Sequence, residues 1–536
     1  MRRSTRSYRG KYAGSRRRWL AVSVAASLLA AACGGDDGST EGAETGGSID
    51  TGVKDAVQSQ LASTTSEGAT TSAAAAQPTT WAEWEAQGAK QREATVTKIK
   101  NNKWGVGPDK MLRGPGGWTV DLNKCPAGWN AQEGLTDTEI KIGHTFPYSG
   151  TLAEYGNIGR GMKNYFNYIG AIPDSTGKSR KINFLEKDDG YDPARTIPLV
   201  DELMDSEKVF ALTTGGSPSV MKTYDKINLR CVPQPIAITG HPAWGDPVNH
   251  PWTTGYQLAY HTEAILWGNY IEQTLPKGSL VTALIMNNDF GKAYQAGFQA
   301  FLAQSKHELR FEFELIEPTA PTITNEMTTL AAKKPDVFIV MTAGTSCTQA
   351  ITESAQNGLK ESAKQLWQPS VCKGSNFVGK DKVGGDGSAS NGWLVVGGGV
   401  IDFNDPVSAT LPQIVFAVQQ LAKDGYVIKS SAQFGNGYVF GYVLGEYIQV
   451  ASQLDGGLTR PNLMLAIRAM DFTSPFMMPG IKLNMNGAKD AYMVEGSEIG
   501  KYDSAKQSFS QVAPPVDLSG KSSNCVWDQS IANCKS

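Results

Sequence analysis

The sequence has almost no net charge, because its 50 basic residues nearly balance its 52 acidic residues. A domain that binds nucleic acid usually carries a basic face, so we expect no nucleic-acid partner. The five histidines and seven cysteines show no close ligand spacing, and the sequence predicts neither a metal nor another cofactor. Ser346 and Cys347 have no histidine base motif beside them, so a nucleophilic enzyme is not predicted either.

Residues 1–32 have the pattern of a signal peptide. An arginine-rich head precedes the apolar run 19–32, which is shorter than the roughly 20 residues of a membrane span. Three alanines then lead to Cys33, a junction that resembles a bacterial lipobox, although Leu29 stands one position further from the cysteine than usual. We expect Cys33 to carry a lipid that anchors the protein on the extracytoplasmic face of the cell membrane. Plain secretion is the alternative, and general and twin-arginine export both stay open.

Residues 33–80 contain mostly Gly, Ser, Thr, Ala and acidic residues. Such a composition cannot bury enough apolar surface to order itself, and it predicts a flexible tether. Residues 81–136 carry several tryptophans, with a helical pattern from 81 to about 100. We expect this N-terminal extension to pack on the main body, and its function stays open.

Besides Cys33, six cysteines are available for disulfides in an exported protein: Cys125, Cys231, Cys347, Cys372, Cys525 and Cys534. Six cysteines allow 15 pairings. Cys347 and Cys372 end neighbouring strand-like runs, and Cys525 and Cys534 are close in the sequence, which leaves Cys125 with Cys231. We predict these three pairs. Reduced, buried thiols are the alternative, which an oxidising compartment disfavours.

From residue 139 onward, short apolar runs alternate with helical patterns. Strands are predicted at 140–146, 181–186, 209–213, 235–239, 280–286 and 337–341, and helices at 155–169, 193–205, 218–227, 260–274 and 294–304. This alternation predicts an α/β fold in which helices cover both faces of parallel sheets, and the number of units favours two doubly wound lobes. Glycines four apart in 437–445 predict close helix packing rather than a dinucleotide-binding loop.

Three loops at the predicted carboxyl ends of strands combine glycine with hydroxyl residues. They contain Ser149 with Tyr155, the run 213–217, and Thr239 with Gly240 and His241. Ligands of such folds bind at this edge of the sheet, and a helix that begins with free N–H groups favours an anionic group such as a carboxylate. Ordinary strand-to-helix turns are the alternative for the loops, and a structural or rim position is the alternative for His241.

Several short motifs occur in a specific order: IKIGHTFPYSG at 140–150, EKDDG at 186–190, NDFG at 288–291, KPDV at 334–337 and GWLV at 392–395. With them, the chain from about 138 to 509 resembles the type I periplasmic binding proteins of the branched-chain amino acid (leucine/isoleucine/valine-binding) family. The resemblance implies two Rossmann-like lobes joined by three hinge strands, an arrangement called a Venus flytrap. By analogy, the parts are lobe 1 at 137–257 and 397–478, lobe 2 at 258–396 and 479–510, and a C-terminal tail at 511–536.

The resemblance also implies which residues bind the ligand. In the family, lobe 1 holds a ligand carboxylate through small hydroxyl residues and backbone N–H groups. The matching positions are Thr214, Gly215, Thr239, Gly240 and His241 in lobe 1, Ser149 and Tyr155 at the border of the cleft, and Phe290, Gly344 and Thr345 in lobe 2.

One departure from the family bears on the ligand. Amino-acid-binding relatives have an acidic residue in lobe 2 that pairs with the ligand ammonium. The corresponding segment here, Trp367-Gln368-Pro369-Ser370, has no carboxylate, and a buried ammonium without a partner is costly. A carboxylate, an amide or an aromatic acid is therefore as compatible as an amino acid, unless Asp289 supplies the charge.

The sequence thus predicts a monomeric, non-enzymatic substrate-binding lipoprotein that captures a small-molecule ligand for an ABC importer. Its expected partners are the permease and ATPase subunits, and its lipid anchor joins it to the membrane. A receptor that senses the ligand and regulates a membrane signalling partner is the alternative with the same fold. An envelope hydrolase is a third hypothesis, which no acid, base and nucleophile constellation supports.

Overall fold

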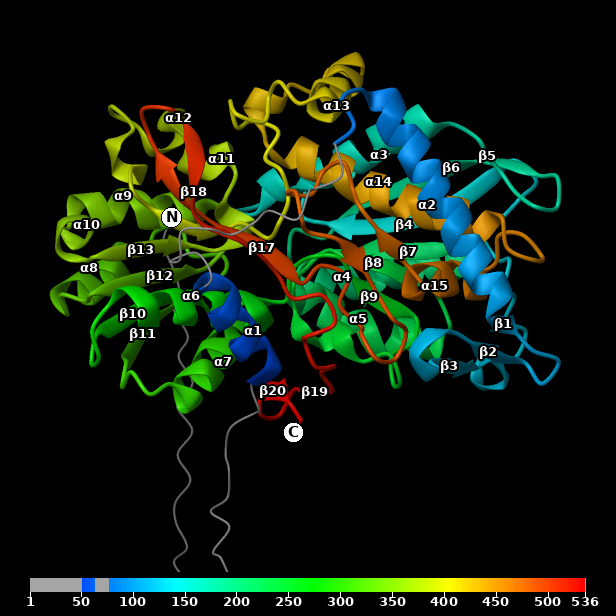
Figure 1. The fold of residues 1–536 in the computed structure, drawn as a ribbon, viewed down its shortest axis with the longest axis horizontal. Helices are drawn as coiled ribbons and strands as arrows, with labels where there is room; N and C mark the ends of the chain where they lie inside the picture. Colours follow the sequence, from blue (N-terminus) through cyan, green and yellow to red (C-terminus); the bar gives the residue numbers. More distant parts are fainter. Residues whose placement is uncertain (1–50, 63–76, 536) are drawn as a thin grey trace, which may run out of the picture. The chain divides into compact units, whose positions relative to one another are not determined.

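Two separate sheets organise the chain (Figure 1). The structure is a computed structural model that describes residues 51–62 and 77–535. The predicted signal peptide, Cys33 and most of the predicted tether lie outside the described residues. Each sheet consists mainly of parallel strands and is the base of one lobe, as the alternation of apolar runs and helical patterns predicts.

Lobe 1 is built on a four-stranded sheet in the order β5-β6-β4-β7. A parallel bridge between Gly215 and Ile238 continues it to a further strand pair. The strands are β4 (Glu139–Phe146), β5 (Ile172–Pro173), β6 (Ser179–Asp188), β7 (Ala211–Thr214), β8 (Gln234–Ala237) and β9 (Thr253–Gly255). The helices are α3 (Asn157–Ile169), α4 (Pro193–Asp201), α5 (Ser217–Leu229), α13 (Pro412–Lys423), α14 (Gln433–Ser452) and α15 (Arg460–Arg468).

The long helix α14 is buried along almost its whole length and packs on α3. A side chain at Gly437 would collide with the backbone of Ile158, and one at Gly161 would collide with the backbone of Phe434. Glycines on both helices therefore allow the two backbones to approach closely. The interpretation of the glycine repeat as a packing feature is confirmed.

Lobe 2 is built on a seven-stranded sheet in the order β11-β10-β12-β13-β14-β17-β18. The first five strands are parallel, and the last two are antiparallel. The strands are β10 (Leu280–Met286), β11 (Arg310–Ile316), β12 (Val337–Met341), β13 (Gln365–Gln368), β14 (Leu394–Val396), β17 (Gly496–Asp503) and β18 (Ser508–Asp517). The helices are α6 (Tyr260–Thr274), α7 (Asp289–Gln304), α8 (Thr324–Ala332), α9 (Thr345–Gln356), α10 (Leu359–Ser362), α11 (Ser375–Val378) and α12 (Lys380–Val383).

The C-terminal strands, red in Figure 1, complete the sheet of green strands in lobe 2. Strand β18 runs to Asp517, so it continues past the predicted start of the tail at 511. Two short hairpins accompany the C-terminal part of the chain, β15 (Asp471–Phe472) with β16 (Leu483–Asn484), and β19 (Trp527–Asp528) with β20 (Asn533–Cys534).

Part of the predicted tether is helical in the structure. Helix α1 (Thr51–Ala62) contacts α6 and β18 of lobe 2. Val57 is completely buried there, and Lys54 lies 5.0 Å from the centre of the Phe301 ring and donates a hydrogen bond to the carbonyl oxygen of Gln304. Composition predicted a flexible chain because the segment has little apolar surface to bury. A helix of 12 residues is marginal alone, and the contacts with lobe 2 stabilise it.

The N-terminal extension packs on lobe 1. Helix α2 (Trp81–Asn101), blue in Figure 1, contacts α13 and α14. Trp81 stacks on Phe416 at 4.4 Å, and Arg92 forms an ion pair with the buried Glu446 at 2.7 Å. The short strands β1 (Gly105–Val106), β2 (Met111–Arg113) and β3 (Thr119–Asp121) follow.

The structure contains three disulfides, in the same pairs that the sequence analysis selects: Cys125–Cys231, Cys347–Cys372 and Cys525–Cys534. The first joins the N-terminal extension to lobe 1, and the second lies within lobe 2.

Among the described residues, no helix combines the length and the apolar composition that a membrane span requires.

Candidate functional site

A cavity of about 1090 Å³, its open mouth included, is lined by residues of both lobes and of the segments that connect them. Most of its lining is aromatic or aliphatic. Lobe 1 contributes Phe146, Tyr155, Tyr191, Gly216 and Thr239, and lobe 2 contributes Tyr260, Phe290, Ala343, Ser370 and Val371. A concave apolar cavity with a few polar groups is the usual form of a small-molecule site.

The lobe 1 wall brings a helix start and a hydroxyl group to the cavity. Helix α5 begins at Ser217, next to the cavity-lining Gly216, and a helix N-terminus favours a negatively charged group. The hydroxyls of Ser217 and Thr239 lie 2.7 Å apart, and Thr239 donates a further hydrogen bond to the hydroxyl of Tyr260. Because Thr239 uses its proton in that bond, Ser217 donates to Thr239. The start of α5 and the hydroxyl of the cavity-lining Tyr260 are therefore the groups here that suit a hydrogen-bond acceptor of a ligand, such as a carboxylate or a carbonyl.

Tyr191 is held beside that helix start in an unusual backbone conformation. Its φ is 63°, and its amide donates a hydrogen bond of 2.8 Å to the carboxylate of Asp189. Burial raises the pKa of Asp189 to about 6. A Cβ atom at Gly216 would lie 2.5 Å from the Tyr191 ring, so the glycine makes room for the ring. Non-glycine residues with positive φ persist where surrounding contacts hold them, often at functional sites.

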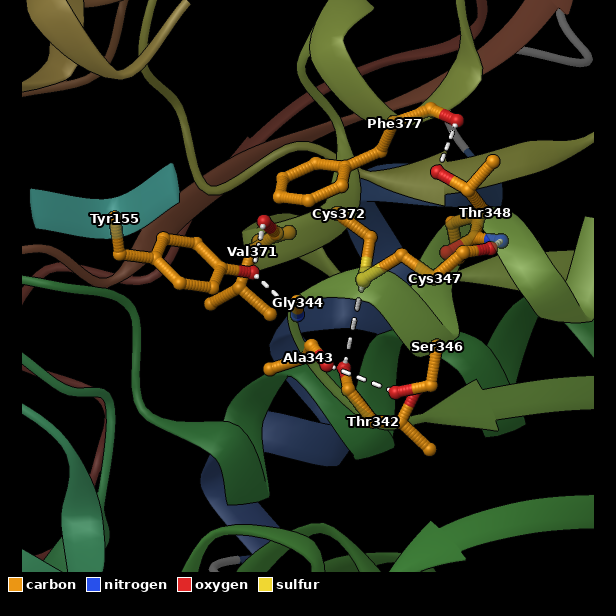
Figure 2. The surroundings of a disulfide bond; sticks show 12 residues. Tyr155, Thr342, Ala343, Gly344, Ser346, Cys347, Thr348, Val371, Cys372 and Phe377 are labelled. Carbon is orange, nitrogen blue, oxygen red and sulfur yellow. Dashed lines mark hydrogen bonds between the residues drawn. A yellow bond between two sulfur atoms is a disulfide. The ribbon is translucent and has the colours of Figure 1, made fainter. Parts of the chain in front are cut away.

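Direct hydrogen bonds join the two lobes across the cavity (Figure 2). The hydroxyl of Tyr155 in lobe 1 donates to the carbonyl oxygen of Val371 at 3.1 Å and accepts from the amide of Gly344 at 3.2 Å, both in lobe 2. Thr151 adds two more, because its hydroxyl donates to Pro318 and its carbonyl accepts from the amide of Thr345. The lobes are thus in contact, in a closed arrangement.

The lobe 2 side of this contact is braced covalently. The disulfide Cys347–Cys372 ties helix α9 to the turn Ser370–Cys372, which carries the Val371 carbonyl (Figure 2). Gly344 precedes α9 with a φ of 72°, and a Cβ atom there would lie 2.6 Å from the carbonyl oxygen of Thr151. Glycine at 344 therefore allows both the backbone conformation and the close approach of the lobes.

A buried carboxylate lies directly behind the same turn. Glu263 on α6 is fully buried and accepts hydrogen bonds from the amide and the hydroxyl of Ser370, at 2.7 and 2.8 Å, and from the hydroxyl of Tyr294 at 2.8 Å. Burial raises its pKa to about 7, and the three hydrogen bonds oppose that shift. Glu263 thereby holds the turn that forms the lobe 2 wall.

The C-terminal disulfide loop, residues 525–534, contacts both lobes near the cavity. Its Cys525 amide donates to the carbonyl of Gly245, and its Trp527 ring lies edge-on to His241 at 4.4 Å, both in lobe 1. Gln529 donates a hydrogen bond of 2.6 Å to the carboxylate of Asp289 in lobe 2. The loop therefore bridges the predicted His241 loop and the start of α7.

The residues that the sequence analysis selected are distributed unevenly around the cavity. Tyr155, Thr239 and Phe290 line it. Thr214, Gly215, Gly240 and His241 are buried next to lining residues without lining it, and Gly344 reaches the site through its hydrogen bond to Tyr155. Ser149 and Thr345 have exposed side chains.

His241 is fully enclosed between Trp244 and Trp527, and its Nδ1 accepts a hydrogen bond from the amide of Ala243. Burial lowers its pKa to about 3, which leaves the ring neutral. Asp289, considered as a partner for a ligand ammonium, is bound by Gln529 and does not line the cavity.

Sequence reasoning missed the polar residues at one end of the cavity, Lys373, Asp402, Gln433 and Asn436. They come from a turn, a connecting segment and the first turn of α14, none of which carries a loop motif at a strand end. No signal in the sequence marks them.

In the part of the chain that the structure describes, no three His, Cys, Asp or Glu side chains are grouped to hold a metal ion.

The comparison with known proteins agrees with this geometry. The sequence profile of the family described as periplasmic binding protein matches residues 139–501. No curated protein matches the sequence. Among solved structures, the chain is similar to a branched-chain amino acid ABC transporter protein from Thermus thermophilus with bound valine, with 16% identity and a TM-score of 0.62 over 72% of this chain and 98% of that chain.

Two further solved structures are similar over comparable lengths. A fatty acid ABC transporter substrate-binding protein from Thermomonospora curvata has 18% identity and a TM-score of 0.60, over 78% of this chain and 97% of that chain. A solute binding protein of an ABC transporter from Rhodopseudomonas palustris, in complex with 3,4-dihydroxy benzoic acid, has 19% identity and a TM-score of 0.58, over 72% of this chain and 98% of that chain. At these identities the likeness shows the shared fold.

Proposed function

The chain belongs to the periplasmic binding protein family, and we propose that it captures a small ligand between its lobes and delivers it to an ABC importer. The observation that supports this role best is the cavity that both lobes line while hydrogen bonds through Tyr155 hold them together. A ligand enclosed in this way shifts the population toward the closed form. The closed form then docks on the permease, and the ATPase subunits supply the energy. The proposed role includes no chemical step.

The relatives bind valine, 3,4-dihydroxybenzoate and, by its description, a fatty acid. A ligand with an apolar body suits the aromatic and aliphatic lining of the cavity here. An acceptor group of the ligand fits the start of α5 and the hydroxyl of Tyr260. The proposed ligand class therefore covers amino acids, amides and small aliphatic or aromatic acids.

A thermal-shift screen over these classes tests the proposal, because a ligand that binds only the native state raises the melting temperature. The positive compounds are then titrated by calorimetry against two variants, Phe290→Ala in the cavity and Leu229→Ala on the surface, where the Leu229 side chain is 73% exposed. We expect Phe290→Ala to weaken binding and Leu229→Ala to leave it unchanged. Equal affinity in both variants would mean that the ligand binds outside the cavity.

The cellular location belongs to the same proposal. We propose that Cys33 is lipidated, that the protein resides on the extracytoplasmic face of the cell membrane, and that it acts as a monomer. Mass spectrometry of the protein purified from membranes should find a diacylglyceryl group on an N-terminal Cys33. An unmodified cysteine, or a mature chain that starts elsewhere, contradicts the anchor and leaves ligand capture untouched.

A further inference from the structure

The polar end of the cavity is formed by Lys373, Asp402, Gln433 and Asn436. Asp402 follows the segment 397–401, which connects β14 of lobe 2 to lobe 1, and Gln433 and Asn436 lie in the first turn of α14. Among the described residues that line the cavity, Lys373 and Asp402 are the only charged ones, and the rest of the lining is mostly aromatic and aliphatic. The charge balance at this end therefore decides which ligand group the cavity accepts there.

The positive charge at this end is already neutralised. Lys373 forms a close ion pair with Glu498, and its Nζ also donates to the carbonyl oxygen of Val400 at 3.0 Å. The second carboxylate oxygen of Glu498 accepts from the amide of Gly399 at 3.1 Å. The two side chains are only 12% and 5% exposed. The charge of the lysine is thus already paired with a carboxylate of the protein.

The negative charge of Asp402 has no such partner. Its carboxylate accepts one hydrogen bond, from the amide of Asn404 to Oδ1 at 2.8 Å. Among the described residues, no basic group lies within ion-pair distance of it, and no side chain or backbone group donates to Oδ2. Asn436 donates from its Nδ2 to the side-chain oxygen of Gln433 at 2.9 Å, and no group in the described part of the chain donates to its Oδ1. Two acceptor oxygens are therefore available at this end.

Burial of Asp402 raises its pKa, the hydrogen bond from Asn404 and the nearby Lys373 lower it only in part, and the negative charge of Asp405 raises it further. Burial therefore makes the charged form of this carboxylate unfavourable in free energy, and a cationic partner from outside the protein would offset that desolvation. A ligand carboxylate at the same place would bring a second negative charge next to Asp402, with Lys373 already paired.

We propose that Asp402 is a specificity-determining residue that pairs with a protonated amine of the ligand, with Asn436 accepting a second N–H. This inference rests on the proposed function and deepens it: the captured molecule has an apolar body and an amino group. The ammonium partner that the sequence lacks at Trp367-Gln368-Pro369-Ser370 is supplied instead by the segment that returns to lobe 1. An acceptor group of the same ligand, where present, lies at the start of α5 and the hydroxyl of Tyr260.

Calorimetric titration with matched probes tests the assignment. Phenethylamine, 3-phenylpropanamide and 3-phenylpropionate share one apolar body, and isopentylamine, 4-methylpentanamide and 4-methylpentanoate share another. We expect the wild-type protein to bind each amine at least tenfold more tightly than its matched carboxylate. Asp402→Asn should weaken amine binding at least tenfold and reduce the discrimination against the carboxylates.

Asp471→Asn is the matched control, because the Asp471 side chain is 52% exposed, pairs with Lys482 at 3.6 Å and does not line the cavity. It should bind the amines as the wild-type protein does. Circular dichroism tests whether both variants are folded. If Asp402→Asn is not folded, the preference of the wild-type protein among the six probes still decides whether this end of the cavity selects an amine.

The outcomes separate this inference from the proposed function. Carboxylates that bind the wild-type protein as tightly as amines, or amines that bind Asp402→Asn unchanged, overturn the role of Asp402 while solute capture stands. A wild-type protein that binds no amine-bearing probe overturns the assignment as well. Failure of every compound in the wider thermal-shift screen would instead count against solute capture itself.

Discussion

The hydroxyl of Tyr155 offers a direct test of how the lobes are held together. It donates to Val371 at 3.1 Å and accepts from Gly344 at 3.2 Å, so Tyr155→Phe removes two hydrogen bonds between the lobes and keeps the aromatic ring. A typical hydrogen bond contributes about 0.5–1.5 kcal/mol. The closed arrangement should therefore lose about 1–3 kcal/mol relative to an open one, which corresponds to roughly a 5–150-fold lower ratio of closed to open molecules.

Small-angle X-ray scattering of the ligand-free protein measures this change, because opening of the lobes increases the radius of gyration. Calorimetry with the tightest compound from the ligand screen gives a second readout. A ligand that binds the closed form binds more weakly when fewer molecules are closed, up to the same factor. Both measurements should move in the same direction in Tyr155→Phe.

Tyr224→Phe is the control, because the Tyr224 hydroxyl donates to the carbonyl oxygen of Ala243 at 2.7 Å within lobe 1. This variant also loses a buried tyrosine hydroxyl, but no contact between the lobes. Its scattering and its ligand affinity should match those of the wild-type protein. If Tyr155→Phe and Tyr224→Phe are indistinguishable in both measurements, the hydrogen bonds of Tyr155 do not control closure, and the reasoning fails.

Three further changes have definite expected outcomes. Gly344→Ala places a methyl group 2.6 Å from the Thr151 carbonyl at a φ of 72°, so scattering should show a more open protein and calorimetry a weaker ligand affinity, and a compact, tight-binding variant contradicts this. Glu263 keeps its proton up to about pH 7 in the folded protein but only to about pH 4.5 when unfolded, so the free energy of unfolding should fall by about 3 kcal/mol across that window. Denaturant titrations of Glu263→Gln should lack this part of the pH slope, and parallel profiles for the two proteins would refute it. Replacing Cys525 and Cys534 by Ser removes a short covalent loop worth roughly 2–3 kcal/mol, so limited proteolysis should cut the C-terminal segment faster, whereas unchanged cleavage shows that its other contacts suffice.

The strand and helix pattern was predictable where the apolar runs are continuous. Helix 260–274 and strands 280–286 and 337–341 have the predicted bounds in the structure. Each is buried along most or all of its length, and such segments leave a strong periodic signal. The hairpin of β17 and β18 and helix α1 left none, because none of them has a continuous apolar run. Their stability comes from lobe 2, whose sheet the hairpin extends and on whose surface α1 packs.

The sequence by itself determined the α/β class, the two lobes and the loops in which Tyr155 and Thr239 reach the cavity, whereas Phe290 was found through the family resemblance. Local order was enough for this, because apolar periodicity and loop chemistry at strand ends are properties of adjacent residues. Only the tertiary structure decided that Asp402 and Asn436 share the cavity with them, and that Glu263 lies behind Ser370. Those groups are brought together by chain segments that are distant in the sequence, and their charge and burial depend on neighbours that no local pattern specifies.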